Sequence, residues 1–137
     1  MSDTAARRAA RLERIGNSRY AASNGRGGTI GIGTDFTPVD LLLAGIGGCT
    51  ATDVDILTSR RAEPGAFEVR VGAEKVRDEA GNHLAGIVVT FQVRFPDGEQ
   101  GDAARALLPG AVRRSHDRLC TVSRTVEPGT PVATRIE

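Results

Sequence analysis

The sequence predicts an α+β fold with an antiparallel sheet and a long central helix. Two observations favour it. A long apolar helical pattern separates short strand patterns from a pair of alternating strands, and further helical patterns follow that pair. The chain has 137 residues, enough for one domain with a usable core, so we expect a single domain over residues 1–137. Residues 1–9 are small and basic, and we expect them to be frayed.

Three short strands are predicted before the helix, at residues 12–15, 19–23 and 29–33. Gly16-Asn17 indicates a turn after the first strand. Asn24-Gly25 is a strong hairpin signal after the second strand.

The long helix has a clear start. Thr37 is a good N-cap, Pro38 suits the first helical position, and Asp40 is placed as the acid of a capping box. The helix should end near Arg60, because Pro64-Gly65 follows. Spacings of three and four place one set of residues on a broad face: Leu41, Leu42, Gly45, Cys49, Thr52 and Ile56.

Glycines cluster just before a cysteine inside this helix, at Gly45, Gly47 and Gly48 ahead of Cys49. A glycine in a helix interior costs about 1 kcal/mol against alanine. We therefore expect another backbone to approach the helix closely here, as in a helix–helix contact.

Beyond the helix, the alternation at residues 67–71 and 87–95 predicts two half-buried strands, with a turn at 78–82. Helical pieces are predicted at 101–108 and 111–119, with a break or kink at Pro109-Gly110. Residues 121–126 and 132–136 are predicted as closing strands.

Composition argues against several classes of partner. The net charge is +1, and four Phe, one Tyr and no Trp offer little to stack bases, so no nucleic acid is expected. The arginine pairs at 60–61 and 113–114 are interpreted as helix-end and surface charges. The longest apolar stretch, residues 41–49, is short for a bilayer, and no signal-peptide pattern opens the chain. We expect a cytoplasmic protein with no membrane partner.

The two cysteines, Cys49 and Cys120, are the main candidates for chemistry. Without an export signal they argue against a secreted disulfide scaffold. A cytosolic pair is typical of catalytic, redox-active or metal-binding sites, and two unrelated buried thiols are the other interpretation.

Three motifs resemble the OsmC/Ohr family, the osmotically inducible protein C and organic hydroperoxide resistance proteins. Thr37-Pro38-x-Asp40-Leu41-Leu42 opens the helix, Gly47-Gly48-Cys49-Thr50-Ala51-Thr52-Asp53-Val54 lies within it, and Cys120-Thr121-Val122-Ser123 comes near the end. The resemblance covers the order of elements from about residue 11 onward. The second motif is most similar to the less characterised OsmC-like branch.

The resemblance implies an intertwined homodimer with long helices at its centre and two active sites at the subunit interface. It implies thiol-dependent reduction of organic hydroperoxides, with Cys49 as the peroxidatic and Cys120 as the resolving cysteine. Arg26, in Gly25-Arg26-Gly27-Gly28, matches the family arginine that activates the thiolate. No cofactor is implied, and the reductant would be a dihydrolipoyl or thioredoxin-like dithiol.

One position departs from the family pattern. Hydroperoxide resistance proteins carry Glu after the helix-start proline, where it pairs with the arginine, and this chain has Val39. Asp40 follows one residue later, about 100° around the helix, where it serves as a cap. A second hypothesis is therefore a stress-related dimer that binds an apolar ligand at the interface with weak or no turnover.

The chemistry requires an ionised thiol. Burial should raise the pKa of Cys49, and Arg26 is the cation expected to offset this. Peroxide attack would leave a sulfenic acid that Cys120 converts to a disulfide, provided the two Cα atoms come within roughly 4.4–6.8 Å.

Two histidines and two aspartates are further candidates for a functional role. His116, Asp53 and Asp117 could complete a metal site with the thiols, but the short-spaced Cys pair of structural zinc is missing, so no metal is expected. His116 is interpreted as a surface or interface residue, with tuning of Cys120 as the alternative. Asp53 is expected to make a structural hydrogen bond or salt bridge, and His83 to be a solvated turn residue.

Overall fold

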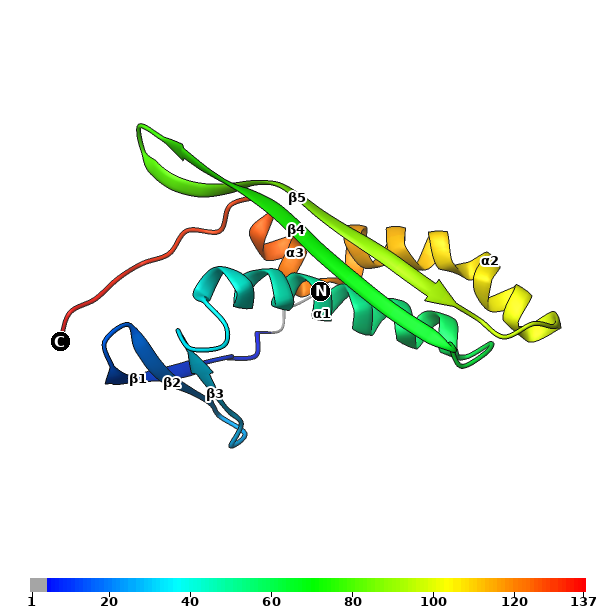
Figure 1. Ribbon diagram of the computed structural model, residues 1–137, viewed down its shortest axis with the longest axis horizontal. Coiled ribbons are helices and arrows are strands. Elements are labelled where there is room, and N and C mark those ends of the chain that lie inside the picture. The colour runs from blue at the N-terminus through cyan, green and yellow to red at the C-terminus, as the bar shows by residue number, and fades with distance from the viewer. Residues whose placement is uncertain (1–4) are drawn as a thin grey trace. The chain divides into compact units, whose positions relative to one another are not determined.

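The computed structural model describes residues 5–137 and contains two compact units, one ending at Leu42 and the other running from Leu43 to Glu137 (Figure 1). Within the described residues, two antiparallel sheets and three α-helices make an α+β fold, as the sequence predicted. Residues 5–9 have no regular structure, and the first four residues of the segment predicted to be frayed lie outside the described residues. That the two units form one domain stays a prediction.

The first unit holds a three-stranded antiparallel sheet in the order β1-β2-β3. Its strands are β1 (Ala10–Gly16), β2 (Arg19–Asn24) and β3 (Thr29–Ile32), so all three predicted strands are confirmed. Asn24 closes the loop between β2 and β3, because its Oδ1 accepts the N–H groups of Arg26 and Gly28, each at 2.9 Å. Gly27 takes the positive φ of 86° that this turn requires.

Helix α1 (Pro38–Ser59) begins with the predicted capping box. The N–H of Asp40 donates to Thr37 Oγ1 at 3.2 Å, and the N–H of Thr37 donates to Asp40 Oδ2 at 2.9 Å. The buried residues of α1 form a stripe at near four-residue spacing: Ile46, Gly47, Thr50, Val54 and Thr58.

The face of α1 that carries Cys49 is not the stripe that the single chain buries. Leu42 is 39% exposed and Ile56 is 52% exposed. A single chain covers only one side of this helix, so the apolar side that carries Cys49 is half open.

By length and composition alone, α1 is sufficient to cross a membrane, with 22 residues and a mean hydropathy of 1.3 over its most apolar window. Core helices of soluble proteins meet the same criterion. Here Asp53 lies inside α1 and accepts a hydrogen bond from Ser115 of another element, and Gly47 packs on a strand. These contacts are those of a core helix, and the absence of a membrane partner stays a prediction.

The second unit contains a long hairpin of β4 (Ala66–Asp78) and β5 (Gly81–Arg94), which lies along α1 and the next helix (Figure 1). The predicted apolar alternation is confirmed by three cross-strand pairs on one face: Phe67–Val93, Val69–Phe91 and Val71–Val89. A bulge interrupts the register, with Gly86 at a φ of 62°. His83 lies within β5 rather than in the turn, and it is exposed.

The contact that requires a glycine at position 47 of α1 differs from the one predicted. A Cβ on Gly47 would lie 2.7 Å from Val71 Cγ2 and 3.7 Å from Val69 Cγ1, so side chains of β4, not another backbone, require this glycine. Around Gly45 and Gly48 a Cβ would meet nothing within 4 Å.

The chain ends in α2 (Glu99–Arg114), the π-helix η1 (Ser115–Leu119) and α3 (Thr121–Val126). Three predictions are wrong here. Pro109 does not break α2, whose packed face with Ala104 and Ala111 continues past it, and the alternative of a kink stays a prediction. Residues 121–126 form a helix rather than a strand, and the Cys120 sulfur accepts the Ser123 N–H at the start of that helix. The strand predicted at 132–136 does not form, since residues 131–137 have no regular structure.

Candidate functional site

The structure brings the two cysteines together. Cys120 lies close enough to the Cys49 side chain to raise the pKa of that thiol. Both are free thiols. Cys49 is half-buried in the middle of α1, whereas Cys120 is fully buried between η1 and α3. Two thiols from elements far apart in sequence therefore form one candidate active site.

Burial raises the pKa of the Cys49 thiol above its ordinary value, as the sequence predicted. The backbone N–H of Val122 acts the other way, Cys120 raises the pKa further, and the N–H of Thr121 lowers it. These two N–H groups lie in the first turn of α3 and are free to donate. Since the net effect is a raised pKa, Cys49 is mainly a neutral thiol at neutral pH unless a cation approaches it.

Cys120 is held by Ser123, one helical turn further along the chain. The Ser123 N–H donates to Cys120 Sγ at 3.4 Å, and Cys120 Sγ donates to Ser123 Oγ at 3.3 Å. The cysteine thus serves as the N-cap of α3, and its sulfur has a defined orientation.

A buried polar chain lies beside the thiols. Ser115 Oγ donates to Asp53 Oδ2 at 2.8 Å and lies 2.7 Å from Thr50 Oγ1. The hydrogen bond expected for Asp53 is confirmed, and its partner comes from η1. Thr50 directly follows Cys49 in α1, so this hydrogen-bond network begins one residue after the thiol.

His116 is exposed, as expected for a surface residue, and it joins η1 to the end of α3. Its Nδ1 lies 2.8 Å from Asp117 Oδ1 and its Nε2 lies 3.0 Å from Glu127 Oε2. The hydrogen bond to Asp117, then the charge of Glu127, raise the pKa of His116 above its ordinary value. The alternative that His116 tunes Cys120 stays untested, since its hydrogen-bond partners are these two carboxylates.

The remaining predicted residues lie in the first unit or at the helix start. Arg26 is exposed in the loop between β2 and β3, and its pairing with Cys49 stays a prediction. Asp40 caps α1, and its hydrogen bonds from Thr37 lower the pKa of its carboxyl. Val39 is 39% exposed in the first turn of α1.

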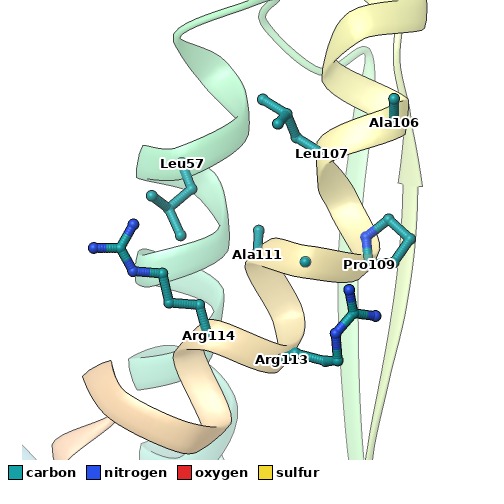
Figure 2. A pocket seen from close by; sticks show the side chains of 8 residues that line it. Leu57, Ala106, Leu107, Pro109, Ala111, Arg113 and Arg114 are labelled. Carbon is teal, nitrogen blue, oxygen red and sulfur yellow. The ribbon is translucent and has the colours of Figure 1, made fainter.

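Two cavities flank this region in the second unit. One of about 190 Å³ has apolar walls from α1, β5 and α3, and His116, Ser123 and Glu127 supply its polar groups. The other, about 320 Å³, lies between α1 and α2 (Figure 2). In Figure 2 the Arg114 guanidinium lies on the side of Leu57, and that of Arg113 lies toward Pro109. Across residues 5–137, no group of three or more His, Cys, Asp or Glu side chains is placed to hold a metal ion.

Sequence reasoning missed Ser115, Ser123 and the donors of α3. The segment after Cys120 was predicted as a strand, and a strand offers no cluster of free N–H groups. Ser115 lies 65 residues from Thr50, and no local pattern marks that contact. The spacing of Cys120 and Ser123, a cap followed three residues later by its donor, is the one local signal that was available.

Comparison with known proteins agrees with this architecture. A family model described as OsmC-like protein matches residues 31–135. No curated protein matches the chain.

Several solved structures share the fold. A hypothetical protein from Aquifex aeolicus VF5 is 21% identical, covers 92% of this chain and 91% of its own, and has a TM-score of 0.75. An OsmC-like protein of unknown function from Vibrio cholerae is 11% identical, with 90% and 95% coverage and a TM-score of 0.72. The organic hydroperoxide resistance protein OhrB of Bacillus subtilis is 17% identical, with 90% and 93% coverage and a TM-score of 0.53.

Proposed function

The chain belongs to the OsmC-like protein family, and on that premise we propose that it reduces organic hydroperoxides with Cys49 as the peroxidatic and Cys120 as the resolving thiol. The observation that carries the proposal is that two free thiols, one half-buried and one buried, lie close enough for Cys120 to raise the pKa of Cys49. The proposed substrate class is taken by analogy from solved structures of this fold that are named organic hydroperoxide resistance proteins, in Bacillus subtilis and Legionella pneumophila.

The proposed reaction balances with two thiols and one external dithiol. The Cys49 thiolate attacks the peroxide, the O–O bond breaks, and the alkoxide leaves as an alcohol after taking a proton. Cys49 is then a sulfenic acid. Cys120 attacks that sulfur, the S–S bond forms, and water leaves. A dithiol of the dihydrolipoyl or thioredoxin-like kind reduces the disulfide and is itself oxidised.

Ionisation of Cys49 is the demanding step, because burial and the neighbouring thiol both raise its pKa. We propose that Arg26 supplies the compensating charge, since a guanidinium stays protonated and offers several donors. Its Asn24-closed turn is short and glycine-flanked, which suits an arginine presented at a loop tip. The acid expected to orient it is replaced by Val39.

We also propose that the working form is a cytoplasmic homodimer. Leu42 and Ile56 are exposed on the side of α1 that carries Cys49, and a second copy of the chain is the partner that the family resemblance implies. Light scattering should give twice the mass of the 14.4 kDa chain. A monomer at micromolar concentration would contradict this part of the proposal.

The activity is tested by following loss of cumene hydroperoxide with a dithiol reductant. Wild-type protein should turn over, Cys49→Ser should be inactive, and Cys120→Ser should consume about one equivalent and then stop. Arg26→Ala should lower the second-order rate constant by at least tenfold, because a thiolate without a nearby cation is a minor species. Absence of any consumption by the wild type would refute the enzymatic function.

A second candidate is a dimer that binds an apolar ligand with weak turnover. The observation that favours it is the replacement of the arginine-pairing acid by Val39, together with a raised pKa of Cys49. Saturable binding of a fluorescent fatty acid, with peroxide consumption no faster than that of free cysteine, would support this candidate over the first.

A further inference from the structure

One serine links the two elements that carry the cysteines. Ser115 opens the π-helix η1 and is 0% exposed. Its hydroxyl contacts Asp53 at 2.8 Å and Thr50 at 2.7 Å, both on α1. Its carbonyl accepts the N–H of Cys120 at 2.7 Å. Ser115 therefore bonds to the helix of one thiol with its side chain and to the other cysteine with its backbone.

The direction of each hydrogen bond in this chain is determined. A carboxylate only accepts, so the single hydroxyl proton of Ser115 goes to Asp53. Thr50 must then donate to Ser115 Oγ. Among the described residues, no buried side-chain nitrogen or oxygen lacks a hydrogen-bond partner. The hydrogen-bond network of Thr50, Ser115 and Asp53 is therefore fully satisfied.

The π-helical winding explains why the backbone contact matters. The Cys120 N–H bonds five residues back to Ser115, whereas an α-helix would use the residue four positions back. The extra residue in the turn sets the direction in which Cys120 leaves η1 and begins α3. A fixed Ser115 therefore fixes the place of Cys120 relative to Thr50 and Asp53, which lie within one turn of Cys49.

We propose that Ser115, anchored by Asp53, is a positioning residue for closure of the bond between Cys49 and Cys120. In that step the Cys120 sulfur attacks the sulfenic sulfur of Cys49, the S–S bond forms, the S–O bond breaks, and the hydroxide leaves as water with the Cys120 proton. The inference rests on the proposed function only for the identity of the oxidant.

The first experiment separates the two chemical steps. Wild type and Ser115→Ala receive one equivalent of cumene hydroperoxide, and quenched samples are analysed by mass spectrometry with dimedone to trap the sulfenic acid. Ser115→Ala should form the sulfenic acid within threefold of the wild-type rate, and it should form the disulfide at least about tenfold more slowly. The trapped sulfenic acid should rise accordingly.

The matched control is Thr58→Val. Thr58 is also fully buried on α1, but its hydroxyl donates only to the Val54 carbonyl of its own helix, at 2.8 Å. This variant loses a buried hydrogen bond without touching η1, so its disulfide should form at the wild-type rate. Equal slowing in Thr58→Val and Ser115→Ala would overturn the proposal, because general loss of stability would then explain both.

A second measurement needs no peroxide. In a glutathione redox buffer, two protein thiols and one glutathione disulfide exchange to the Cys49–Cys120 disulfide and two reduced glutathiones. Ser115→Ala should lower the equilibrium constant for this disulfide at least about tenfold. If the wild type forms the disulfide in this buffer but does not react with peroxide, the proposed function fails. The positioning role still stands if Ser115→Ala lowers the equilibrium constant.

Variants of the anchor keep the inference testable if Ser115→Ala does not fold. Asp53→Asn retains an acceptor oxygen for the Ser115 hydroxyl and should form the disulfide at near the wild-type rate. Asp53→Ala removes the acceptor and should behave like Ser115→Ala. If Asp53→Ala, or a folded Ser115→Ala, forms the Cys49–Cys120 disulfide at the wild-type rate, the proposal is overturned.

Discussion

Adjacent glycines in α1 give a sharp prediction about packing. Gly47→Ala places a methyl group 2.7 Å from Val71 Cγ2, closer than carbon atoms pack, so β4 or α1 must shift. Gly48→Ala adds the same methyl one residue later, where nothing lies within 4 Å. The pair differs only in what the new methyl group meets.

The magnitude follows from two opposing effects. Each substitution gains about 1 kcal/mol of helix propensity. Overpacking against Val71 costs roughly 1–3 kcal/mol, so Gly47→Ala should change the free energy of unfolding by about 0 to −2 kcal/mol. Gly48→Ala should instead add about 1 kcal/mol. The variants should therefore differ by about 1–3 kcal/mol, or about 4 °C in Tm for each kcal/mol.

Thermal and urea unfolding, followed by circular dichroism, measure this difference in stability. Repeating both at several protein concentrations tests whether a partner chain contributes. If Gly48 lies against a partner helix, Gly48→Ala should lose stability, and the loss should grow on dilution as a dimer dissociates. Gly47→Ala should show a penalty at every concentration, because its contact lies within one chain. Equal stability of the two variants at high dilution would refute the reasoning about Val71.

Three further predictions concern the cap, the thiols and the exposed histidine. Thr37→Ala should lower the free energy of unfolding by about 1 kcal/mol, measured in urea, because the N-cap of α1 loses its acceptor. Cys120→Ser should lower the pKa of Cys49, measured by the pH dependence of iodoacetamide alkylation, because the neighbouring thiol raises it; an unchanged profile would contradict the thiol contact. His116→Ala should destabilise more at pH 6 than at pH 9. The pKa of His116 is raised in the fold, so its ion pair with Glu127 is fully present below about pH 6.5 and is lost as pH rises through the folded pKa.

Much of the first half of the chain could be predicted from local pattern. The capping box of Thr37 and Asp40, and the turn closed by Asn24, use partners within four residues. Alternation also indicated β4 and β5 correctly, because their paired residues share one half-buried face. The family motifs led to Cys49 and Cys120, although their roles stay predictions.

Local pattern gave the wrong result at three places, two of which depend on tertiary contacts. Thr121-Val122 favours a strand by composition, but the sulfur of Cys120 accepts the Ser123 N–H and starts a helix there. Pro109 indicated a break in α2, yet the buried face with Ala111 holds the helix together. The glycines before Cys49 were explained by a partner backbone, whereas Val71 accounts for Gly47 within the same chain.

The sequence by itself determined the start of α1, the five strands β1 to β5 and the two candidate thiols, since each rests on residues close together in the chain. The tertiary structure alone decided that Cys49 and Cys120 are neighbours and that Ser115 joins their elements. The two hydrogen bonds of Ser115 join residues 62 and 65 positions apart. No spacing rule reaches so far, because such pairs meet only after the hairpin and both long helices have packed.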